Sequence, residues 1–329
     1  MFTFQEIRGN KSLTEQLKAV VSDGKASHAY LFLGGAGAGK RLIANTFAKA
    51  LQCESEGSGQ KPCGNCRSCQ SFDHKNHPDV IYFQALEKPP KYTIEDVRKQ
   101  IVETVDLKPF QYDKKIYIIE KADTLNVQAQ NALLKTLEEP PAHVMFLLLA
   151  ERAEAFLPTI LSRVVTMKIR PLSEETVAEY LMGTGLSAEE SHTLAAYSQG
   201  RIGQALELME DEAFREMRQD ILGKLEALPS MQEGEAYLMA KELEAYKSDL
   251  RFLDIMELWY RDLLMAKSLR EERYLIQKDK KEAIFRGANE PAEKLAKKAE
   301  AVRKARIRLS QNANFRLTME VMLMDLKEN

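Results

Sequence analysis

A glycine-rich segment, Gly34-Gly35-Ala36-Gly37-Ala38-Gly39-Lys40, constrains the fold of this chain more than any other feature. It fits the pattern G-x-x-x-x-G-K, follows an apolar run from Tyr30 to Leu33, and precedes apolar residues at helical spacing from Ile43 to Leu51. Glycines let such a loop curl so that its N–H groups face a phosphate, which the lysine also reaches. The pattern therefore predicts a nucleotide-binding loop formed by Gly34, Gly35, Gly37, Gly39 and Lys40. A glycine-rich turn with a solvated lysine is the other interpretation.

The first half of the chain alternates strand and helix patterns, which is typical of a parallel α/β sheet. Thr93 to Asp96 resembles a capping box that opens a helix with Ile94, Val97, Ile101 and Val105 on its apolar face. Asn126 to Glu139 is a further helix, stopped by Pro140-Pro141. Besides the run before the glycines, strands are expected at Val80–Phe83, Ile116–Ile119, Met145–Leu149 and Val165–Ile169.

After Pro171 almost only helical patterns remain, with Ser173 and Ser187 as expected N-caps. From about Met209 the chain is predicted to be helical to its end. Two apolar stripes are expected to form helix-bundle core, Phe252, Ile255, Met256, Trp259 and Leu263 in one, and Leu317, Val321 and Leu326 in the other. The predicted fold class is α/β plus all-α.

The residue after the loop lysine is Arg41, where a working phosphate loop has Ser or Thr. That hydroxyl ligates Mg²⁺, whereas a guanidinium has no acceptor and repels a cation. The sequence therefore predicts a degraded Mg²⁺ site, although ATP or ADP could still bind through the loop.

A second departure follows the strand expected at Ile116–Ile119. A working site would end this strand in Asp-Glu, but here it ends in Glu120-Lys121. Glu120 could still approach a metal, whereas Lys121 cannot polarise water as a carboxylate base would. If the strand has a nucleotide role at all, hydrolysis is expected to be lost.

All four cysteines fall within 17 residues, with the spacing C-x9-C-x2-C-x2-C. Thiolates from Cys53, Cys63, Cys66 and Cys69 suit a tetrahedral, structural Zn²⁺ site with no open position for catalysis. Free reduced cysteines and an iron–sulfur cluster are the alternatives.

Composition excludes two broad classes of function. The net charge is −2, so the whole chain is not a polycation for nucleic acid. The longest apolar run, Val144 to Ala150, is too short to span a bilayer, and the N-terminus lacks the pattern of a signal peptide. A cytoplasmic location and no membrane partner are expected.

Several motifs together resemble the bacterial clamp-loader subunits, a family of AAA+ proteins. They are Asn131-Ala132-Leu133-Leu134-Lys135-Thr136-Leu137-Glu138-Glu139-Pro140-Pro141, Thr159-Ile160-Leu161-Ser162-Arg163-Val164 and His28-Ala29-Tyr30-Leu31-Phe32. Asn312-Ala313-Asn314-Phe315-Arg316 resembles the closing helix of the delta-prime branch. The match covers essentially the full chain. Val164 stands where the family often has Cys, a position outside the chemistry.

The resemblance implies three domains: an AAA+ α/β domain at 1–169 with a zinc module at 53–69, a helical lid at 170–208, and a helical collar at 209–329. It also implies a hetero-pentamer with delta and gamma/tau subunits that loads the beta sliding clamp onto primed DNA during replication. Polymerase (nucleotidyltransferase) activity would belong to the DNA polymerase III holoenzyme, not to this chain.

The resemblance assigns Arg163 as an arginine finger that acts in trans on a neighbour's ATP. A delocalised cation of this kind stabilises charge on the transferring phosphoryl group. A surface salt bridge is the alternative for any single arginine. Gly203 stands where motor subunits have a nucleotide-sensing arginine, and Arg201, on another helical face, is a poor substitute.

Three other functions stay open at this point. The chain could be an ATP-hydrolysing gamma/tau-like motor, against which Arg41, Lys121 and Gly203 argue. It could be a scaffold without any catalytic role, against which Arg163 argues. An unrelated P-loop enzyme, such as a kinase, would not explain the long helical C-terminal half.

Overall fold

The structure is a computed structural model, and it describes residues 2–55, 60–83 and 92–328. Its contacts divide the chain into two compact units, Met1–Val177 with Gln199–Gln204, and Ala178–Ser198 with Ala205–Asn329. The domain boundaries after residues 169 and 208 are not decided by this division and stay predictions. Within the described residues, no helix combines the length and apolarity needed to cross a membrane.

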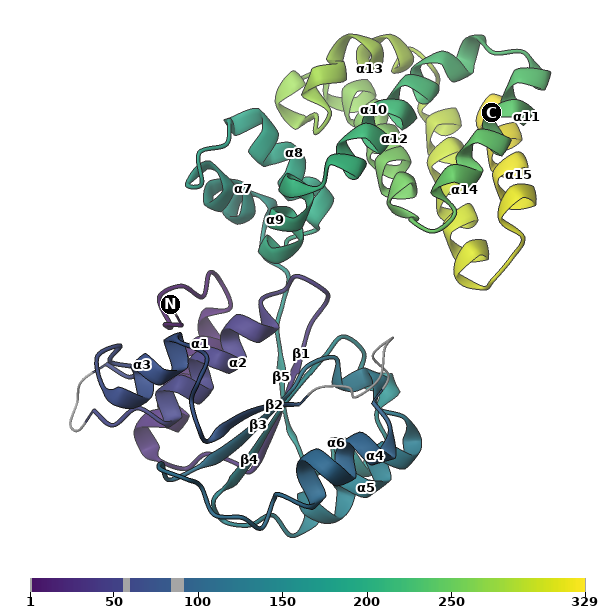
Figure 1. Ribbon diagram of the computed structural model, residues 1–329. Coiled ribbons are helices and arrows are strands. Elements are labelled where there is room, and N and C mark those ends of the chain that lie inside the picture. Colours follow the sequence, from purple (N-terminus) through teal and green to yellow (C-terminus); the bar gives the residue numbers. More distant parts are fainter. Residues whose placement is uncertain (1, 56–59, 84–91, 329) are drawn as a thin grey trace. The chain divides into compact units, whose positions relative to one another are not determined.

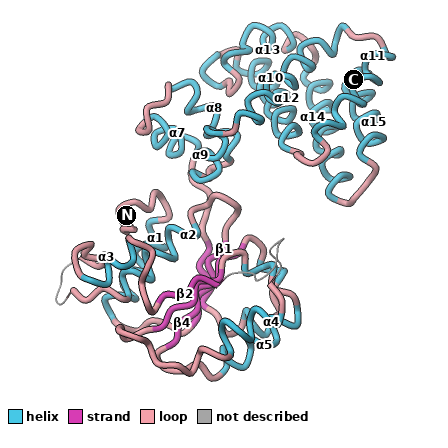
Figure 2. The backbone as a smooth tube through the Cα atoms, in the orientation of Figure 1, coloured by secondary structure: helices cyan, strands magenta, loops and turns pink. Residues whose placement is uncertain are grey.

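The first unit is built on one parallel sheet with strand order β2-β3-β4-β1-β5 (Figures 1 and 2). All five strands lie where the sequence predicts them, with ends that differ by one or two residues. Their bounds are β1 Ala29–Leu33, β2 Val80–Phe83, β3 Lys115–Ile119, β4 Val144–Ala150 and β5 Val165–Lys168.

Helices cover both faces of this sheet (Figure 1). Because side chains alternate along a strand, Phe32 and Leu147 enter one core layer while Leu31 and Leu148 enter the other. The helices of the first layer are α1 Lys11–Asp23, α2 Lys40–Leu51 and α3 Arg67–Asp73; those of the second are α4 Ile94–Val97, α5 Val127–Glu138 and α6 Pro158–Leu161. The parallel sheet is thus buried on both faces. Because its faces are covered, side chains that bind ligands are expected at the carboxyl ends of the strands and in the loops that follow them.

The capping box predicted at Thr93 is confirmed, because the Thr93 hydroxyl accepts from Asp96 N–H and the Asp96 carboxylate accepts from Thr93 N–H. The helix itself is less regular than predicted. After α4 it becomes a π-helix over Arg98–Val102, although Val97, Ile101 and Val105 are buried as expected.

The second unit is helical throughout its described residues. The helix α7 Glu174–Met182 leads into it, and it continues with α8 Ala188–Ser198, α9 Ile202–Glu210, α10 Glu212–Ala227, α11 Glu233–Glu242, α12 Arg251–Leu269, α13 Lys281–Gly287, α14 Ala292–Ser310 and α15 Phe315–Glu328. The predicted N-caps Ser173 and Ser187 accept from Thr176 N–H and Glu190 N–H. The predicted apolar stripe of α12, from Phe252 to Leu263, is buried in the core of this unit.

Of the apolar stripe predicted for α15, Leu326 is buried and Val321 half-buried, but the prediction for Leu317 is wrong. Leu317 is 60% exposed, and the buried face consists of Phe315, Met319, Met322, Leu323 and Leu326. These positions follow the helical spacing i, i+4, i+7, i+8 and i+11, whereas Leu317 is two residues out of step with them. Three methionines and three leucines on one helix offered more than one apolar face, and packing against α11 and α14 selects this one.

We expect Leu323→Ala to lower the free energy of unfolding of the second unit by about 2–5 kcal/mol, because Leu323 is 1% exposed and the change leaves a cavity. Leu317→Ala on the same helix is the control and should change it by about 0.5 kcal/mol or less. Denaturant unfolding followed by circular dichroism measures both. Equal losses would contradict the assigned face.

Candidate functional site

The glycine-rich loop joins β1 to α2 at the carboxyl edge of the sheet. Gly39 has φ +86°, and the ammonium of Lys40 donates to the carbonyls of Gly34 and Gly35 at 2.7 and 2.8 Å. The lysine therefore lies over the loop, and the predicted strand–loop–helix arrangement is present. The helix N-terminus and Lys40 together favour an anion here.

Arg41 forms an ion pair with Glu120, with Nε 2.9 Å from Oε1. Arg41 is the first-turn residue of α2 after the lysine, and Glu120 directly follows β3. The guanidinium therefore pairs with the carboxylate that in a working site would help to bind Mg²⁺. The guanidinium balances the charge of Glu120 in an exposed pair, and it has no acceptor with which to ligate a metal.

Two acidic residues affect Lys40, and one of them, Glu151, was not identified from the sequence. The Glu151 carboxylate lies 3.8 Å from the Lys40 ammonium, and Asp123 contributes to its electrostatic environment. Burial lowers the pKa of Lys40 and Arg201 adds to this, while Glu151 and Asp123 oppose it. The signal for Glu151 was its place directly after β4, since β4 is the neighbour of β1 and both strands end at the same edge.

The backbone of Gly203 lies directly on the loop. Its N–H donates to the Gly37 carbonyl at 2.9 Å, and a Cβ added at residue 203 would be 2.8 Å from that oxygen. A Cβ added at Gly37, where φ is +72°, would be 2.3 Å from the nitrogen of Gln204. The side chain of Arg201 lies against Gly35, so that a Cβ there would be 3.2 Å from Nη1. The first turn of α9 and the loop thus fit together only with glycine at both contact points.

Arg163 lies outside this loop, directly after α6 and before β5. Its Nη2 is 2.8 Å from Oε1 of Glu138, and its Nη1 donates to the Thr159 carbonyl at 2.9 Å and to Ser162 Oγ at 3.1 Å. The guanidinium is 34% exposed. Within the chain alone it forms a surface salt bridge, the arrangement that the sequence left open beside the finger.

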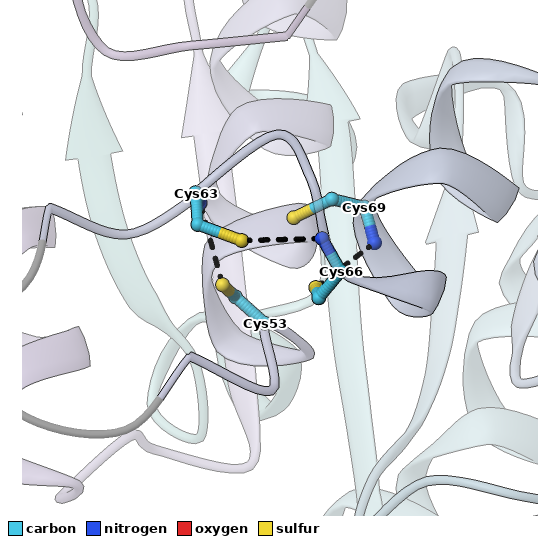
Figure 3. A group of neighbouring side chains, drawn as sticks. All are labelled: Cys53, Cys63, Cys66 and Cys69. Atoms are coloured by element: carbon cyan, nitrogen blue, oxygen red, sulfur yellow. Dashed lines mark hydrogen bonds between the residues drawn. The ribbon is translucent and has the colours of Figure 1, made fainter.

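The four cysteines converge (Figure 3). Their Sγ atoms all lie within 4.8 Å of one another, close to the separation of about 3.8 Å that tetrahedral Zn–S bonds of about 2.3 Å require. Cys53 follows α2, Cys63 lies in the next loop, and Cys66 and Cys69 cap and enter α3. Residues 56–59 of the predicted zinc module lie outside the described residues. The donor set fits a metal ion held by four sulfurs.

Backbone N–H groups support the thiolate form in this cluster. The N–H groups of Cys63, Cys66 and Cys69 point at the sulfurs of Cys53, Cys63 and Cys66 at 3.3–3.4 Å (Figure 3). Desolvation raises the pKa of Cys63, but the N–H groups of Asn65 and Cys66 outweigh it and lower the pKa to about 6. Burial raises the pKa of Cys53 and of Cys69.

The cysteine module is anchored to the helix that carries the phosphate loop. The ammonium of Lys49, which is fully buried in α2, lies 2.7 and 2.8 Å from the carboxylate oxygens of Asp73 at the end of α3. A buried lysine is stable only when paired in this way. The pair therefore holds the module in a fixed place on the first unit.

Comparison with known proteins gives the family. Residues 9–173 match the family described as DNA polymerase III, delta subunit, and residues 212–328 match its C-terminal family. The chain is 31% identical over 311 residues to DNA polymerase III subunit delta' of Bacillus subtilis, covering 92% of each chain. The chain belongs to the delta-prime family of DNA polymerase III clamp-loader subunits.

Tau and gamma subunits are also similar to this delta-prime family member, and DNA polymerase III subunit tau of Bacillus subtilis is 28% identical over 344 residues, 97% of this chain and 60% of that protein. DNA polymerase III subunit tau/gamma of Haemophilus influenzae is 36% identical over 179 residues, which is 54% of this chain and 25% of that protein. A solved gamma subunit-related protein of Thermotoga maritima has 17% identity over 95% of this chain and 98% of its own, with a TM-score of 0.40.

We expect Gly203→Ala to lower the melting temperature of this delta-prime family chain, because its Cβ would press on the Gly37 carbonyl and force α9 from the loop. The free energy of unfolding should fall by about 1–3 kcal/mol. The control is Gly223→Ala within α10, where no atom lies within 4 Å of the added Cβ and a gain of about 0.4–1 kcal/mol is expected. Scanning calorimetry compares them, and a neutral Gly203→Ala would contradict the close contact.

Proposed function

We propose that this chain is a non-hydrolysing AAA+ subunit that supplies Arg163 in trans to the ATP site of a neighbouring gamma/tau motor subunit. Through that action it helps to load the beta sliding clamp onto primed DNA, in a hetero-pentamer with delta and gamma/tau. The observation that carries the proposal is the Arg41–Glu120 ion pair, which leaves its own site without a place for Mg²⁺.

Three features support the loss of hydrolysis. The Arg41 guanidinium balances the carboxylate that would bind the metal. Lys121, with φ +50° in the turn after β3, brings a positive charge where a carboxylate base is needed. Gly203 supplies only backbone to the loop, so no sensing arginine projects from that position. The gamma/tau-like motor is therefore the weaker alternative.

The trans role of Arg163 rests on its position and its chemistry. The guanidinium is one-third exposed, next to the exposed end of α5, and a delocalised cation of this kind stabilises charge on a transferring phosphoryl group. Its salt bridge to Glu138 is an exposed one, and such pairs are easily exchanged for another anion. A phosphate of a neighbouring subunit would be such an anion.

We further propose that Cys53, Cys63, Cys66 and Cys69 hold a structural Zn²⁺. Four sulfurs close enough to bind one ion tetrahedrally leave no coordination position for a catalytic water. ATP or ADP would bind weakly, through the loop and Lys40 alone. The domain layout of 1–169, 170–208 and 209–329, as AAA+ domain, lid and collar, belongs to this proposal.

Arg163→Ala should slow ATP hydrolysis at the neighbouring site by about 10³-fold or more, since this is the usual contribution of an arginine finger. The reconstituted loader, with clamp and primed DNA, should lose the share of activity that this site provides. Arg98→Ala, which removes an exposed arginine paired with Glu95, is the control and should leave the rate unchanged. A loader with Arg163→Ala that hydrolyses ATP at the normal rate would refute the trans role.

Purified chain should contain one zinc per molecule by mass spectrometry of the metal, and Cys66→Ser should reduce this to a small fraction. The melting temperature should fall together with the metal content, because binding energy of a structural metal is folding energy. Ser71→Ala, within α3, is the control and should retain the metal. Iron, or substoichiometric zinc in the unmodified chain, would contradict the assignment.

A further inference from the structure

Glu138 stands out as the anionic partner of Arg163. It is the last residue of α5, and its Oε1 lies 2.8 Å from Nη2 of the arginine. The other terminal nitrogen of Arg163 is held by the Thr159 carbonyl and by Ser162 Oγ, both in or next to α6. One end of the guanidinium is thus fixed to its own helix, and the other end depends on Glu138.

Helix stability does not account for a glutamate at this position. The carboxyl end of a helix carries partial negative charge, which disfavours acidic side chains and favours basic ones. Nevertheless α5 ends in Glu138, and its C-cap is Glu139. Two carboxylates at the unfavourable end of a helix indicate a role outside the helix, and Arg163 is the cation that Glu138 contacts.

A phosphate could compete with Glu138 for this arginine. The side chains are 34% and 49% exposed, so water competes for both and neither is locked by packing. A nucleoside triphosphate carries more negative charge and more acceptor oxygens than one carboxylate. It would also repel Glu138. The guanidinium should therefore exchange Glu138 for the phosphate rather than hold both.

We propose that Glu138 is a positioning residue for Arg163. It keeps the guanidinium in a resting pose on its own subunit, and the finger reaches the neighbour's ATP only by giving up this carboxylate. The proposal rests on the trans role of Arg163. Glu138 then sets how readily the finger engages while no clamp or DNA holds the loader in its active arrangement.

The test compares Glu138→Gln with Glu139→Gln in the reconstituted loader. Glutamine keeps the shape but weakens the competing interaction, so ATP hydrolysis without clamp and DNA should rise by about two- to fivefold, the range expected for an exposed pair. The rate with clamp and primed DNA should stay unchanged, because the finger is then already engaged. Glu139→Gln removes the same charge from the same helix end and should change neither rate.

A second comparison separates this proposal from the trans role itself. The increase in ATP hydrolysis caused by Glu138→Gln should vanish in the double variant with Arg163→Ala, since Glu138 acts through that arginine. If Arg163→Ala lowers hydrolysis but Glu138→Gln matches the unmodified chain or Glu139→Gln, the proposal for Glu138 fails and the trans role stands. If Arg163→Ala has no effect, the trans role fails and the pair is a surface salt bridge only.

Discussion

Arg41 places a guanidinium 2.9 Å from the carboxylate of Glu120, beside a loop whose shape and lysine are those of a phosphate site. In a working site a hydroxyl and an acid at these two positions share a divalent metal, which orients the phosphates and neutralises the charge that develops. The guanidinium neutralises the acid but cannot coordinate water or phosphate oxygen. The charge of Glu120 is thus balanced without nucleotide or metal, and in the proposed function the fold of the site is kept while its hydrolysis is lost.

Two further contacts in the first unit form without any ligand. Gly203 and Gly37 meet through backbone atoms, so α9 and the loop are held by a contact that does not depend on bound nucleotide. The Lys49–Asp73 pair fixes the cysteine module to the same helix that carries the loop. Arg163, on the opposite layer of helices, is by contrast partly exposed and held by exchangeable partners. In the proposed function, the fixed elements serve as a frame and the exposed arginine provides the chemistry.

The sequence predicted the five strands, the phosphate loop and the cysteine cluster because each of these is local: an apolar run, a glycine pattern and a short spacing. It also predicts a degraded metal site, since Arg41 and Glu120-Lys121 fall at fixed places in known patterns, and this stays a prediction. It did not reveal that Arg41 pairs with Glu120, nor that Glu151 lies near Lys40, because both contacts join residues far apart along the chain. The burial of Leu317 in α15 was predicted wrongly for the same reason, since only tertiary packing decides which of the apolar residues of this helix are buried. Glu138 lay inside a quoted motif, but its partner could be seen only once α5 and α6 were placed together.

The central claim is that a site with the Arg41–Glu120 pair does not hydrolyse ATP. Its most direct test is ATP hydrolysis by the purified chain alone, measured with Mg²⁺ and with Lys40→Ala as the control for contaminating ATPases. The account predicts no turnover above that control at any Mg²⁺ concentration, because Arg41 replaces the hydroxyl ligand and pairs with the Glu120 carboxylate. Magnesium-dependent turnover that disappears in Lys40→Ala would show that the site is a working ATPase and would contradict the account.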